Sequence, residues 1–443
     1  MKSDISGFPE FLPNEQIAFN KIVDAIRERF ELHGFSPLDT AAVERISTLL
    51  AKGNDNEIYG LYRLADEKSK KDLGLRFDLT VPLARYVVAN SGKLIFPYKR
   101  YQISPVWRGE RPQYGRYRQF YQCDIDVIGV GDLSIEHDAE IVAIITEVLS
   151  SLDIPNFHTK LNNRKILSGF LKTVVAEKKI DDLIRLIDKI DKISPEEFDE
   201  SLKKMKISQE NVTKLKNFLN MTGRGDNFNI LKRLRTFNFN EEFTNGVMEL
   251  ISVFQILKKL GIEDRQVKIS TGLARGLTYY TGTIFETTFD EDLNDIGSIS
   301  GGGRYDNLTT TLSDKIFPGV GATIGISRLV IKLIEKGLLN VDKFSPATVL
   351  VTVQNHEFVG SYMKIANKLR EAGIKTETYL QNKSLGVQLN YASRKGYNFV
   401  IIANELELLE GKAIFRNLNT KEQIIIRTEY VGKEILKLLA QMH

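Results

Sequence analysis

Cysteine is almost absent from this chain of 443 residues, in which Cys123 stands alone. A single thiol cannot close an internal disulfide, and it cannot supply the several sulfur ligands of a structural zinc site. The five histidines are scattered along the chain, so neither a metal site nor a catalytic triad is indicated. We therefore expect no dedicated protein cage for a metal, and a packed core thiol at Cys123.

Long apolar runs are missing as well. No stretch approaches the roughly 20 apolar residues that cross a bilayer, and the acidic N-terminal segment MKSDISGFPEFLPNEQ lacks the apolar centre of a signal peptide. These absences argue against insertion into a membrane and against secretion. We expect a cytoplasmic protein without a membrane contact.

Size and charge narrow the class of protein further. A chain of 443 residues predicts two or three domains. The net charge is small, at +4, but residues 345–443 hold 13 Lys and Arg against 9 Asp and Glu. This excess is too weak to bind duplex nucleic acid by charge alone, yet it is compatible with a local contact to a nucleic-acid loop.

Residues 96–129, FPYKRYQISPVWRGERPQYGRYRQFYQCDIDVIG, are the most unusual stretch. Six Lys and Arg precede Asp124 there, against one acid, Glu110. The two ends are typical of strands, and Pro112 and Gly115 favour a turn between them, so a basic hairpin is predicted. Arginine makes two-pronged contacts with phosphate and carboxylate oxygens, and the interleaved aromatic side chains suit a stacked base. The hairpin therefore indicates a nucleotide site, with a solvated basic hairpin as the alternative.

Hydrophobic periodicity predicts the remaining elements. The expected helices span residues 13–35, 83–89 and 132–152, a helical lobe covers residues 163–261, and the expected strands include residues 58–64, 73–79 and 266–271. Ser194 and Pro195 are typical of a helix start. Glycines between 319 and 325 would let a strand approach a ligand before a helix that presents Arg328. After a boundary at Phe344, strands and helices alternate in a compact α/β unit.

Four motifs in order resemble those of one enzyme family. Residues 96–129 resemble the second signature motif of class II aminoacyl-tRNA synthetases, and GVGATIGISRL resembles the third. LARGLTYYTGTIFE and SGGGRYDNL resemble two motifs peculiar to histidyl-tRNA synthetases, and the C-terminal unit resembles the anticodon-binding domain of class IIa. The resemblance covers nearly the whole chain, although any one motif alone would be weak.

The resemblance implies a fold and an activity. The expected fold is an α+β catalytic domain on an antiparallel sheet (residues 1–160 and 262–335), with a helical insertion (161–261) and a C-terminal α/β anticodon-binding domain (345–443). The implied enzyme is a histidine–tRNA ligase, which activates L-histidine with ATP to histidyl-adenylate and transfers it to the 3′-terminal adenosine of tRNA(His). ATP would be a substrate used with Mg²⁺, and a homodimer is expected.

The resemblance also implies roles for individual residues. Arg108 and Arg275 would be catalytic, on the carboxylate and the α-phosphate. The histidine site would comprise Asp78, Thr80, Arg108, Gln122, Asp126, Arg275, Tyr279, Tyr280 and Tyr305. The ATP site would comprise Arg108, Glu110, Arg116, Phe120 and Arg328. The acceptor end of the tRNA would meet Arg111, Gln113 and Tyr114.

Within these sites, Asp78, Thr80 and Gln122 would bind the α-amino group, and Asp126 with Tyr280 would face the imidazole ring. Glu110 would either read the adenine amino edge or position Mg²⁺.

Three positions depart from the family pattern. Ala41 or Ala42 stands where the first motif usually has proline, and Thr278 and Ser327 stand where acids are common. The identity of the anticodon-reading residues and the role of the insertion stay open.

Two other readings compete with the ligase. One is the synthetase-like regulatory subunit of the first enzyme of histidine biosynthesis, which generally lacks the anticodon domain and part of the arginine set. The other is a catalytically dead sensor of uncharged tRNA. Arg108, Arg116, Arg275 and Arg328 are all present here, which favours the ligase.

Overall fold

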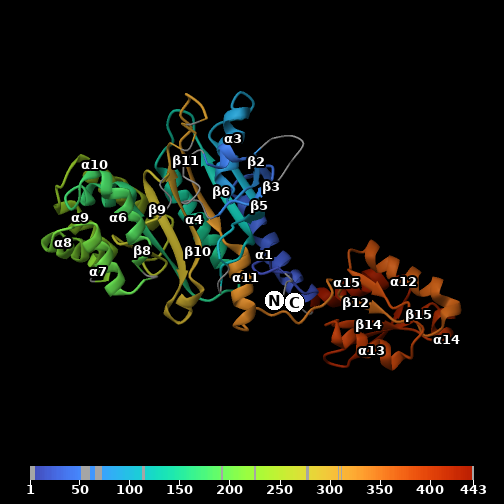
Figure 1. Cartoon of the computed structure of the whole chain (residues 1–443). Coiled ribbons are helices and arrows are strands. Elements are labelled where there is room, and N and C mark those ends of the chain that lie inside the picture. Colours follow the sequence, from blue (N-terminus) through green and yellow to red (C-terminus); the bar gives the residue numbers. More distant parts are fainter. Residues whose placement is uncertain are drawn as a thin grey trace. The chain divides into compact units, whose positions relative to one another are not determined.

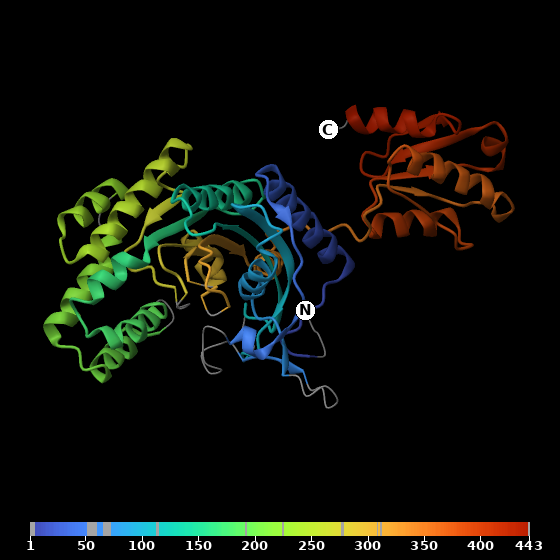
Figure 2. The same ribbon diagram turned by 90° about the horizontal axis from the view of Figure 1, so that it is seen from above.

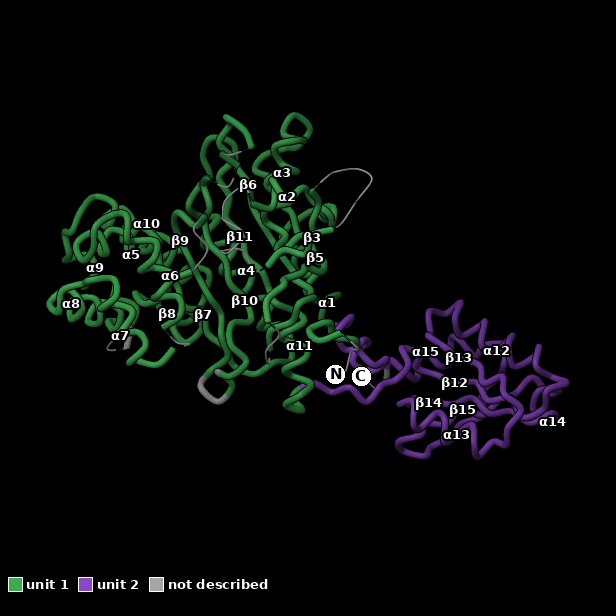
Figure 3. The backbone as a smooth tube through the Cα atoms, viewed as in Figure 1, with its two compact units in different colours: residues 1–10, 22–338 green, residues 11–21, 339–443 purple. Residues whose placement is uncertain are grey.

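The computed structural model describes residues 5–50, 60–64, 72–111, 115–190, 193–223, 226–275, 279–307, 309–310 and 312–441. Its contacts divide the chain into two compact units, one of residues 1–10 and 22–338 and one of residues 11–21 and 339–443 (Figure 3). Each unit has its own sheet, so the expectation of more than one domain is confirmed.

The first unit is built on an eight-stranded sheet with the order β1-β5-β6-β11-β10-β9-β7-β8 (Figure 1). The strands are β1 (Ser36–Pro37), β5 (Tyr98–Trp107), β6 (Gln119–Ile128), β7 (Phe157–Asn163), β8 (Val267–Ile269), β9 (Thr283–Phe289), β10 (Ser298–Tyr305) and β11 (Gly319–Ile324). Neighbours pair antiparallel except at the two edges, where β1 joins β5 and β8 joins β7 in parallel. The predicted antiparallel sheet and its basic hairpin, β5–β6, are confirmed.

Helices cover one face of this sheet. They are the later part of α1 (Pro13–Leu32) and α4 (Glu136–Ser150), whereas α11 (Ile326–Glu335) follows β11 and contacts β6 and β10. Figure 2 shows the later part of α1 and α4 lying outside the curve of the sheet. α4 buries an apolar face that includes Ile141, Ile144 and Val148, and Phe30 of α1 packs against Tyr101 of β5 with ring centroids 6.0 Å apart. The alternation of side chains along the strands leaves the opposite face for polar residues.

A small second sheet precedes the hairpin. It has the order β2-β4-β3 and consists of β2 (Val43–Arg45), β3 (Arg63–Leu64) and β4 (Leu73–Leu75). The short helix α2 (Ile46–Leu49) and helix α3 (Thr80–Asn90) accompany it. The predicted strand 73–79 is too long, because β4 ends at Leu75 and leaves Arg76 and Asp78 in the connection to α3. The predicted strand 58–64 is also too long: residues 58 and 59 lie outside the described residues, and of residues 60–64 only Arg63–Leu64 form a strand.

The predicted helical lobe is confirmed as a run of helices, of which the last is the longest. They are α5 (Arg164–Leu171), η1 (Glu177–Lys179), α6 (Ile180–Ile187), α7 (Pro195–Lys204), α8 (Gln209–Leu219), η3 (Asn220–Gly223), α9 (Asn227–Thr236) and α10 (Glu241–Lys259). The side chain of Ser194 accepts a hydrogen bond from the backbone of Glu197 and begins α7, as predicted. The 3₁₀ segment η4 (Glu291–Ile296) lies between β9 and β10.

The second unit has a five-stranded sheet with the order β13-β12-β14-β15-β16. Its elements are β12 (Val349–Val351), η5 (His356–Phe358), α12 (Val359–Glu371), β13 (Thr376–Thr378), α13 (Leu385–Arg394), β14 (Phe399–Ile402), α14 (Glu405–Leu409), β15 (Lys412–Asn417), β16 (Gln423–Arg427) and α15 (Val431–Gln441). β12 pairs in parallel with β13 and β14, whereas β14, β15 and β16 pair antiparallel. The predicted α/β unit is confirmed.

Candidate functional site

One large cavity of about 1140 Å³ lies in the first unit. Every residue predicted for the histidine site and the ATP site lines it: Asp78, Thr80, Arg108, Glu110, Arg116, Phe120, Gln122, Asp126, Arg275, Tyr279, Tyr280, Tyr305 and Arg328. These residues come from segments up to 250 positions apart in the chain. The fold therefore gathers the predicted residues in one place.

Strand β6 forms the floor of the cavity. Gln122, Asp124 and Asp126 all line it, because side chains two residues apart on a strand share a face. Cys123 between them points the other way, is fully buried and carries a free thiol. Burial raises the pKa of that thiol, so it stays protonated, and the prediction of a packed core cysteine is confirmed.

Asp126 is held by two groups that reach it from different strands. Arg100 of β5 lies directly opposite it and places Nη2 2.6 Å from Oδ2. The hydroxyl of Tyr305 donates to Oδ1 from β10. Burial raises the pKa of Asp126 to about 6, against the opposing effects of Arg100 and Tyr305. The carboxyl group is thus buried and held in one orientation, and Arg100 and Tyr305 favour its ionised form.

Glycines make room for these side chains at two points. A Cβ at Gly321, which pairs with Asp126 across the sheet, would stand 2.0 Å from Oδ1 of that aspartate. A Cβ at Gly301 would stand 2.5 Å from Nη1 of Arg275. Any larger residue would displace the functional group, so both glycines are required by close approach.

Several guanidinium groups converge on the cavity. The Arg108 guanidinium lies 5.0 Å from the ring centroid of Phe120 and donates from Nε to the carbonyl of Phe77. Arg328 donates to the carbonyls of Gly115 and Ser298. Burial lowers the pKa of Arg328, and the neighbouring Arg116 and Arg108 lower it further. Like charges crowded in this way favour a bound anion.

Arg275 also lines the cavity and has an acidic partner. Its Nη1 lies 3.2 Å from Oε1 of Glu286. Burial would lower the pKa of Arg275, but Tyr280 and Glu286 reverse this effect and leave the pKa above its usual value. The guanidinium is therefore a permanent positive charge in the cavity.

Asp78 and Thr80 reach the cavity from the start of α3. The backbone N–H of Val81 donates to Oδ1 of Asp78 at 3.0 Å. Burial raises the pKa of Asp78 to about 6, while this hydrogen bond and the nearby Arg108 oppose the rise. The aromatic wall beside them is formed by Tyr279 and Tyr280, whose ring centroids lie 4.7 Å apart.

The sequence motifs assign no role to some of the residues in and behind the cavity wall. Arg100 was noted only as part of a basic stretch, although the hairpin register places it opposite Asp126. Asp124 and Thr323 line the cavity without a predicted role, and so do Ile187, Asp188 and Asn220 of the helical lobe. The alternation along β6 was a signal for Asp124. For the lobe residues no local signal exists, because their approach depends on tertiary packing.

The predicted acceptor-end residues are placed only in part. Arg111 is exposed at the start of the hairpin loop, whereas Gln113 and Tyr114 lie outside the described residues, as does Thr278. Ala41 is exposed next to β2. Ser327 is buried, and its hydroxyl accepts a hydrogen bond from the backbone of Tyr121 at 2.8 Å. A serine at this position therefore ties α11 to β6.

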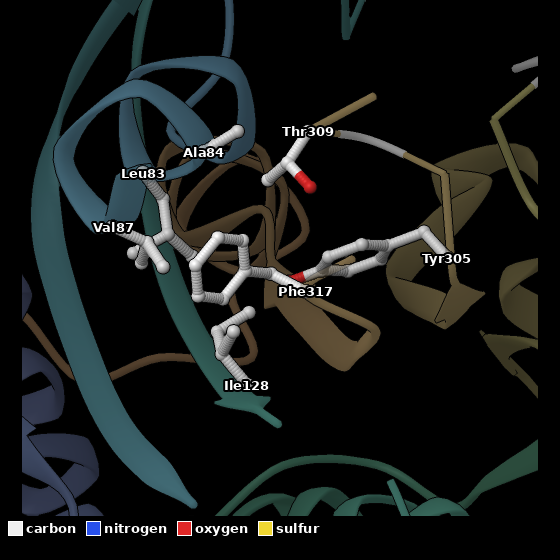
Figure 4. A pocket seen from close by; sticks show the side chains of 7 residues that line it. All are labelled: Leu83, Ala84, Val87, Ile128, Tyr305, Thr309 and Phe317. Atoms are coloured by element: carbon white, nitrogen blue, oxygen red, sulfur yellow. The ribbon is translucent and has the colours of Figure 1, made fainter. Parts of the chain in front are cut away.

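A second, much smaller cavity of about 10 Å³ lies behind Tyr305. Figure 4 shows the rings of Phe317 and Tyr305 facing it, with aliphatic side chains and Thr309 around them. It has room for about one water molecule. It belongs to the packing that supports Tyr305.

Comparisons with family models and with curated proteins all match this chain to histidyl-tRNA synthetases. A family model described as histidyl-tRNA synthetase matches residues 7–329, and a model described as anticodon binding domain matches residues 347–438. Among curated proteins, the chain is 41% identical over 431 residues to "Histidine--tRNA ligase" of Clostridium tetani, covering 96% of this chain and 97% of that one. It is 39% identical over 450 residues to the protein of that name from Nostoc sp. strain PCC 7120, covering 98% and 97%.

Solved structures extend this similarity to three dimensions. The crystal structure of histidyl-tRNA synthetase from Nostoc sp. strain PCC 7120 superposes with a TM-score of 0.88 at 36% identity. The match covers 99% of both chains. Both units of the fold are therefore included in the similarity.

Proposed function

This chain belongs to the histidyl-tRNA synthetase family and is a histidine–tRNA ligase, and from that premise we propose how its residues divide the reaction. In the first step the carboxylate of L-histidine attacks the α-phosphorus of ATP, and pyrophosphate leaves. In the second step a hydroxyl of the 3′-terminal adenosine of tRNA(His) attacks the histidyl carbonyl carbon, and AMP leaves. The convergence of all predicted histidine and ATP residues on one cavity carries this proposal.

The first step brings a carboxylate onto a phosphate that is already negative. Fixed cations lower the barrier most effectively where water is excluded and no reorganisation is needed. Arg108 and Arg275, which line the same cavity, are the proposed catalytic residues and would hold the carboxylate and the α-phosphate. Tight packing of Gly301 against Arg275 supports a fixed orientation for the second of these groups.

Selection of histidine falls to the buried end of the cavity. Asp126 is the proposed partner of the imidazole ring, with Tyr280 beside it and Tyr279 and Tyr305 as further walls. The ion pair with Arg100 and the bond from Tyr305 support this role, because they fix the carboxylate before substrate arrives. A ring without matching nitrogens would leave a buried carboxylate unpaired, which can cost roughly 10⁴-fold in specificity. Asp78, Thr80 and Gln122 would bind the α-amino group.

ATP is proposed to lie at the arginine-rich end. Arg116 and Arg328 would hold its outer phosphates, and Phe120 would stack on the adenine. Mg²⁺ usually binds through phosphate oxygens and one or two carboxylates, and the half-buried Glu110 on the cavity wall is suited to that or to the adenine amino edge. Among the described residues, no group of three or more metal-binding side chains occurs. When bound, Mg²⁺ would neutralise charge on the leaving pyrophosphate.

The remaining proposals concern tRNA and assembly. Residues 345–443 would bind the anticodon end, and Arg111, Gln113 and Tyr114 would meet the acceptor end. A homodimer is proposed, supported by the exposure of Ala41 and Val43 in the segment that resembles the family's first motif. A cytoplasmic location is proposed because tRNA and ATP are available there. Among the described residues, no helix is long and apolar enough to span a membrane.

Histidine-dependent ATP–pyrophosphate exchange tests the proposal. The wild-type chain should exchange with L-histidine and Mg²⁺, and Arg275→Ala should reduce exchange by at least about 100-fold, because a charged contact to the α-phosphate is lost. Histidine binding, measured by calorimetry, should persist in weakened form. If the wild type showed no exchange at saturating histidine, only the two alternative hypotheses would remain, a regulatory subunit and a sensor of uncharged tRNA. Unchanged exchange in Arg275→Ala would remove this residue from the catalytic role.

A further inference from the structure

Two hydrogen-bond acceptors at the floor of the cavity have no donor. Among the residues that the structure describes, none donates to Oε1 of Gln122 or to Oδ1 of Asp124. Both side chains are more than nine-tenths buried and both line the cavity from the same face of β6. Buried acceptors of this kind are rarely left unsatisfied, because their desolvation is costly. Their common direction indicates a ligand that brings several donors.

Thr323 links these two side chains. It lies directly opposite Asp124 on β11 and lines the same cavity. Its Oγ1 accepts a hydrogen bond from Nε2 of Gln122 at 3.0 Å, and its hydroxyl group is hydrogen-bonded to the carboxylate of Asp124. A hydroxyl group has one proton, and the ionised form of Asp124, which is the form that would bind an ammonium group, can only accept it. The amide of Gln122 must therefore donate to Thr323, which turns Oε1 into the cavity.

No donor of a neighbouring described residue makes a hydrogen bond to Oε1 of Gln122 or Oδ1 of Asp124. Gln102, which faces Asp124 from β5, donates to Asp39 at 2.9 Å and to Ser104 at 3.4 Å. Arg100 places Nη2 against Asp126 and the carbonyl of Leu79, and its Nε and Nη1 make no hydrogen bond to any described residue, Asp124 included. Asp78, which is close enough to influence Asp124, is itself an acceptor. Gln122 and Asp124 thus line the cavity with acceptors that no described residue satisfies.

We propose that Asp124 is a further binding residue for the ammonium group of the amino-acid substrate, and that Thr323 is the positioning residue that orients both Gln122 and Asp124 towards it. An ammonium group carries three donors and matches a cluster of acceptors. This assignment rests on the proposed function, and it extends the predicted ammonium site of Asp78, Thr80 and Gln122. Thr323 acts through its hydroxyl group, without contact to the reacting atoms.

The test replaces the hydroxyl group of Thr323 in the full-length chain. Thr323→Val keeps the shape of the side chain, and we expect the KM for histidine in exchange to rise about 10-fold or more, with the KM for ATP unchanged. Thr323→Ser restores the hydroxyl group and should restore the KM. Asp124→Asn should raise the KM by about 10- to 100-fold, because a neutral amide replaces the charged acceptor.

Two inhibitors separate ammonium binding from a general structural effect. L-Histidinol keeps the ammonium group, and 3-(imidazol-4-yl)propanoate lacks it. In Thr323→Val and Asp124→Asn, the inhibition constant of histidinol should rise as the KM for histidine does. The inhibition constant of the propanoate should stay unchanged. Equal weakening of both inhibitors would overturn the inference, since a distorted pocket would affect the ring as well.

Thr287→Val is the matched control. It removes a buried threonine hydroxyl from the same sheet, where Thr287 is hydrogen-bonded to Thr159 and is absent from the cavity wall. Its KM for histidine should equal that of the wild type. An active wild type with unchanged Thr323→Val and Asp124→Asn variants would overturn this inference alone. A wild type without any exchange would overturn the proposed function and the inference with it.

Discussion

Asp126 shows how a single residue acquires its properties from the fold. Its carboxylate is buried on β6, and burial alone would favour the neutral form. Arg100 and Tyr305, which come from 26 positions before and 179 positions after it, oppose this effect by direct contact, although the pKa of Asp126 stays raised at about 6. The residue that is proposed to read the imidazole ring is therefore fixed before the ring arrives, which reduces the cost of reorganisation on binding.

Gly321→Ala should disable this residue without removing any functional group. The new Cβ would stand 2.0 Å from Oδ1 of Asp126, so the carboxylate must move away from Tyr305. We expect kcat/KM for histidine in exchange to fall about 10- to 100-fold, the value of a charge-assisted contact.

Gly325→Ala is its control, because the nearest atom to a Cβ there is 3.8 Å away. An equal loss in both variants would show that the effect comes from the backbone rather than from Asp126.

Asp124 should make the stability of the free enzyme depend on pH. Burial raises its pKa to about 7, opposed by Arg100 and reinforced by Asp126. Between about pH 4 and pH 7 the folded state holds a proton that the unfolded state has released, so the free energy of unfolding falls as pH rises. Asp124→Asn lacks this contribution. The free energy of unfolding of Asp124→Asn minus that of the wild type should therefore rise by on the order of 1–3 kcal/mol between pH 5 and pH 8.

Denaturant titrations at pH 5, 6.5 and 8 measure this difference. The signal should be the fluorescence of Trp107, which lies in β5 of the same unit. A difference between the two proteins that does not change with pH would mean that Asp124 ionises normally. The burial of Asp124 beside Asp126 would then have no effect on its pKa.

At the residue scale, the sequence motifs predicted the cavity wall well but missed the supports behind it. Asp126, Tyr305 and Arg275 were all predicted and all line the cavity. Arg100 and Thr323 were not predicted, because their roles follow from which residue lies opposite which in the sheet. Motifs record side chains that meet a ligand. Cross-strand partners depend on register, which one strand alone does not reveal.

Among the elements, locally determined features were predicted best. The β5–β6 hairpin, helix α1 and the α/β alternation after Phe344 follow from periodicity and turn residues. Strand β8 lies within the predicted strand 266–271, but its parallel pairing with β7, the edge strand β1 and the early end of β4 were not predicted. These strands are two or three residues long, and their pairing joins segments far apart in the chain, so their sequence carries little signal.

Ser327→Ala tests how α11 is tied to the sheet. The bond from the backbone of Tyr121 to the Ser327 hydroxyl joins the start of α11 to β6, one residue before Arg328. Its loss should cost about 0.5–1.5 kcal/mol of stability. The orientation of the Arg328 side chain in the cavity is then less well fixed. We therefore expect the KM for ATP to rise a few-fold while the KM for histidine stays constant.

Ser201→Ala provides the comparison, since the Ser201 hydroxyl bonds the backbone of Glu197 within helix α7, in the helical lobe. It should leave both constants unchanged. A rise in both constants for Ser327→Ala would indicate a general disturbance of the sheet instead of a local loss of orientation.

On the scale of the whole molecule, the two compact units suggest a division of labour. The cavity lies entirely within the first unit, and each unit buries its own core. The proposal assigns adenylate formation to the first unit and anticodon binding to the second. Linking two binding modules typically strengthens overall binding by about 10²- to 10⁴-fold. Removal of the second unit should therefore affect tRNA charging far more than pyrophosphate exchange.

A fragment of residues 1–338 makes this division testable. Exchange should remain within about 10-fold of the full-length chain, because the cavity stays complete, whereas kcat/KM for tRNA(His) should fall by at least about 100-fold. Residues 11–21 belong to the second unit, and Asn14 donates to the carbonyl of Val341, so the fragment must first show a cooperative thermal transition. If both activities fell equally in a folded fragment, the second unit would have to support the cavity itself, and the proposed separation of adenylation from tRNA recognition would be wrong.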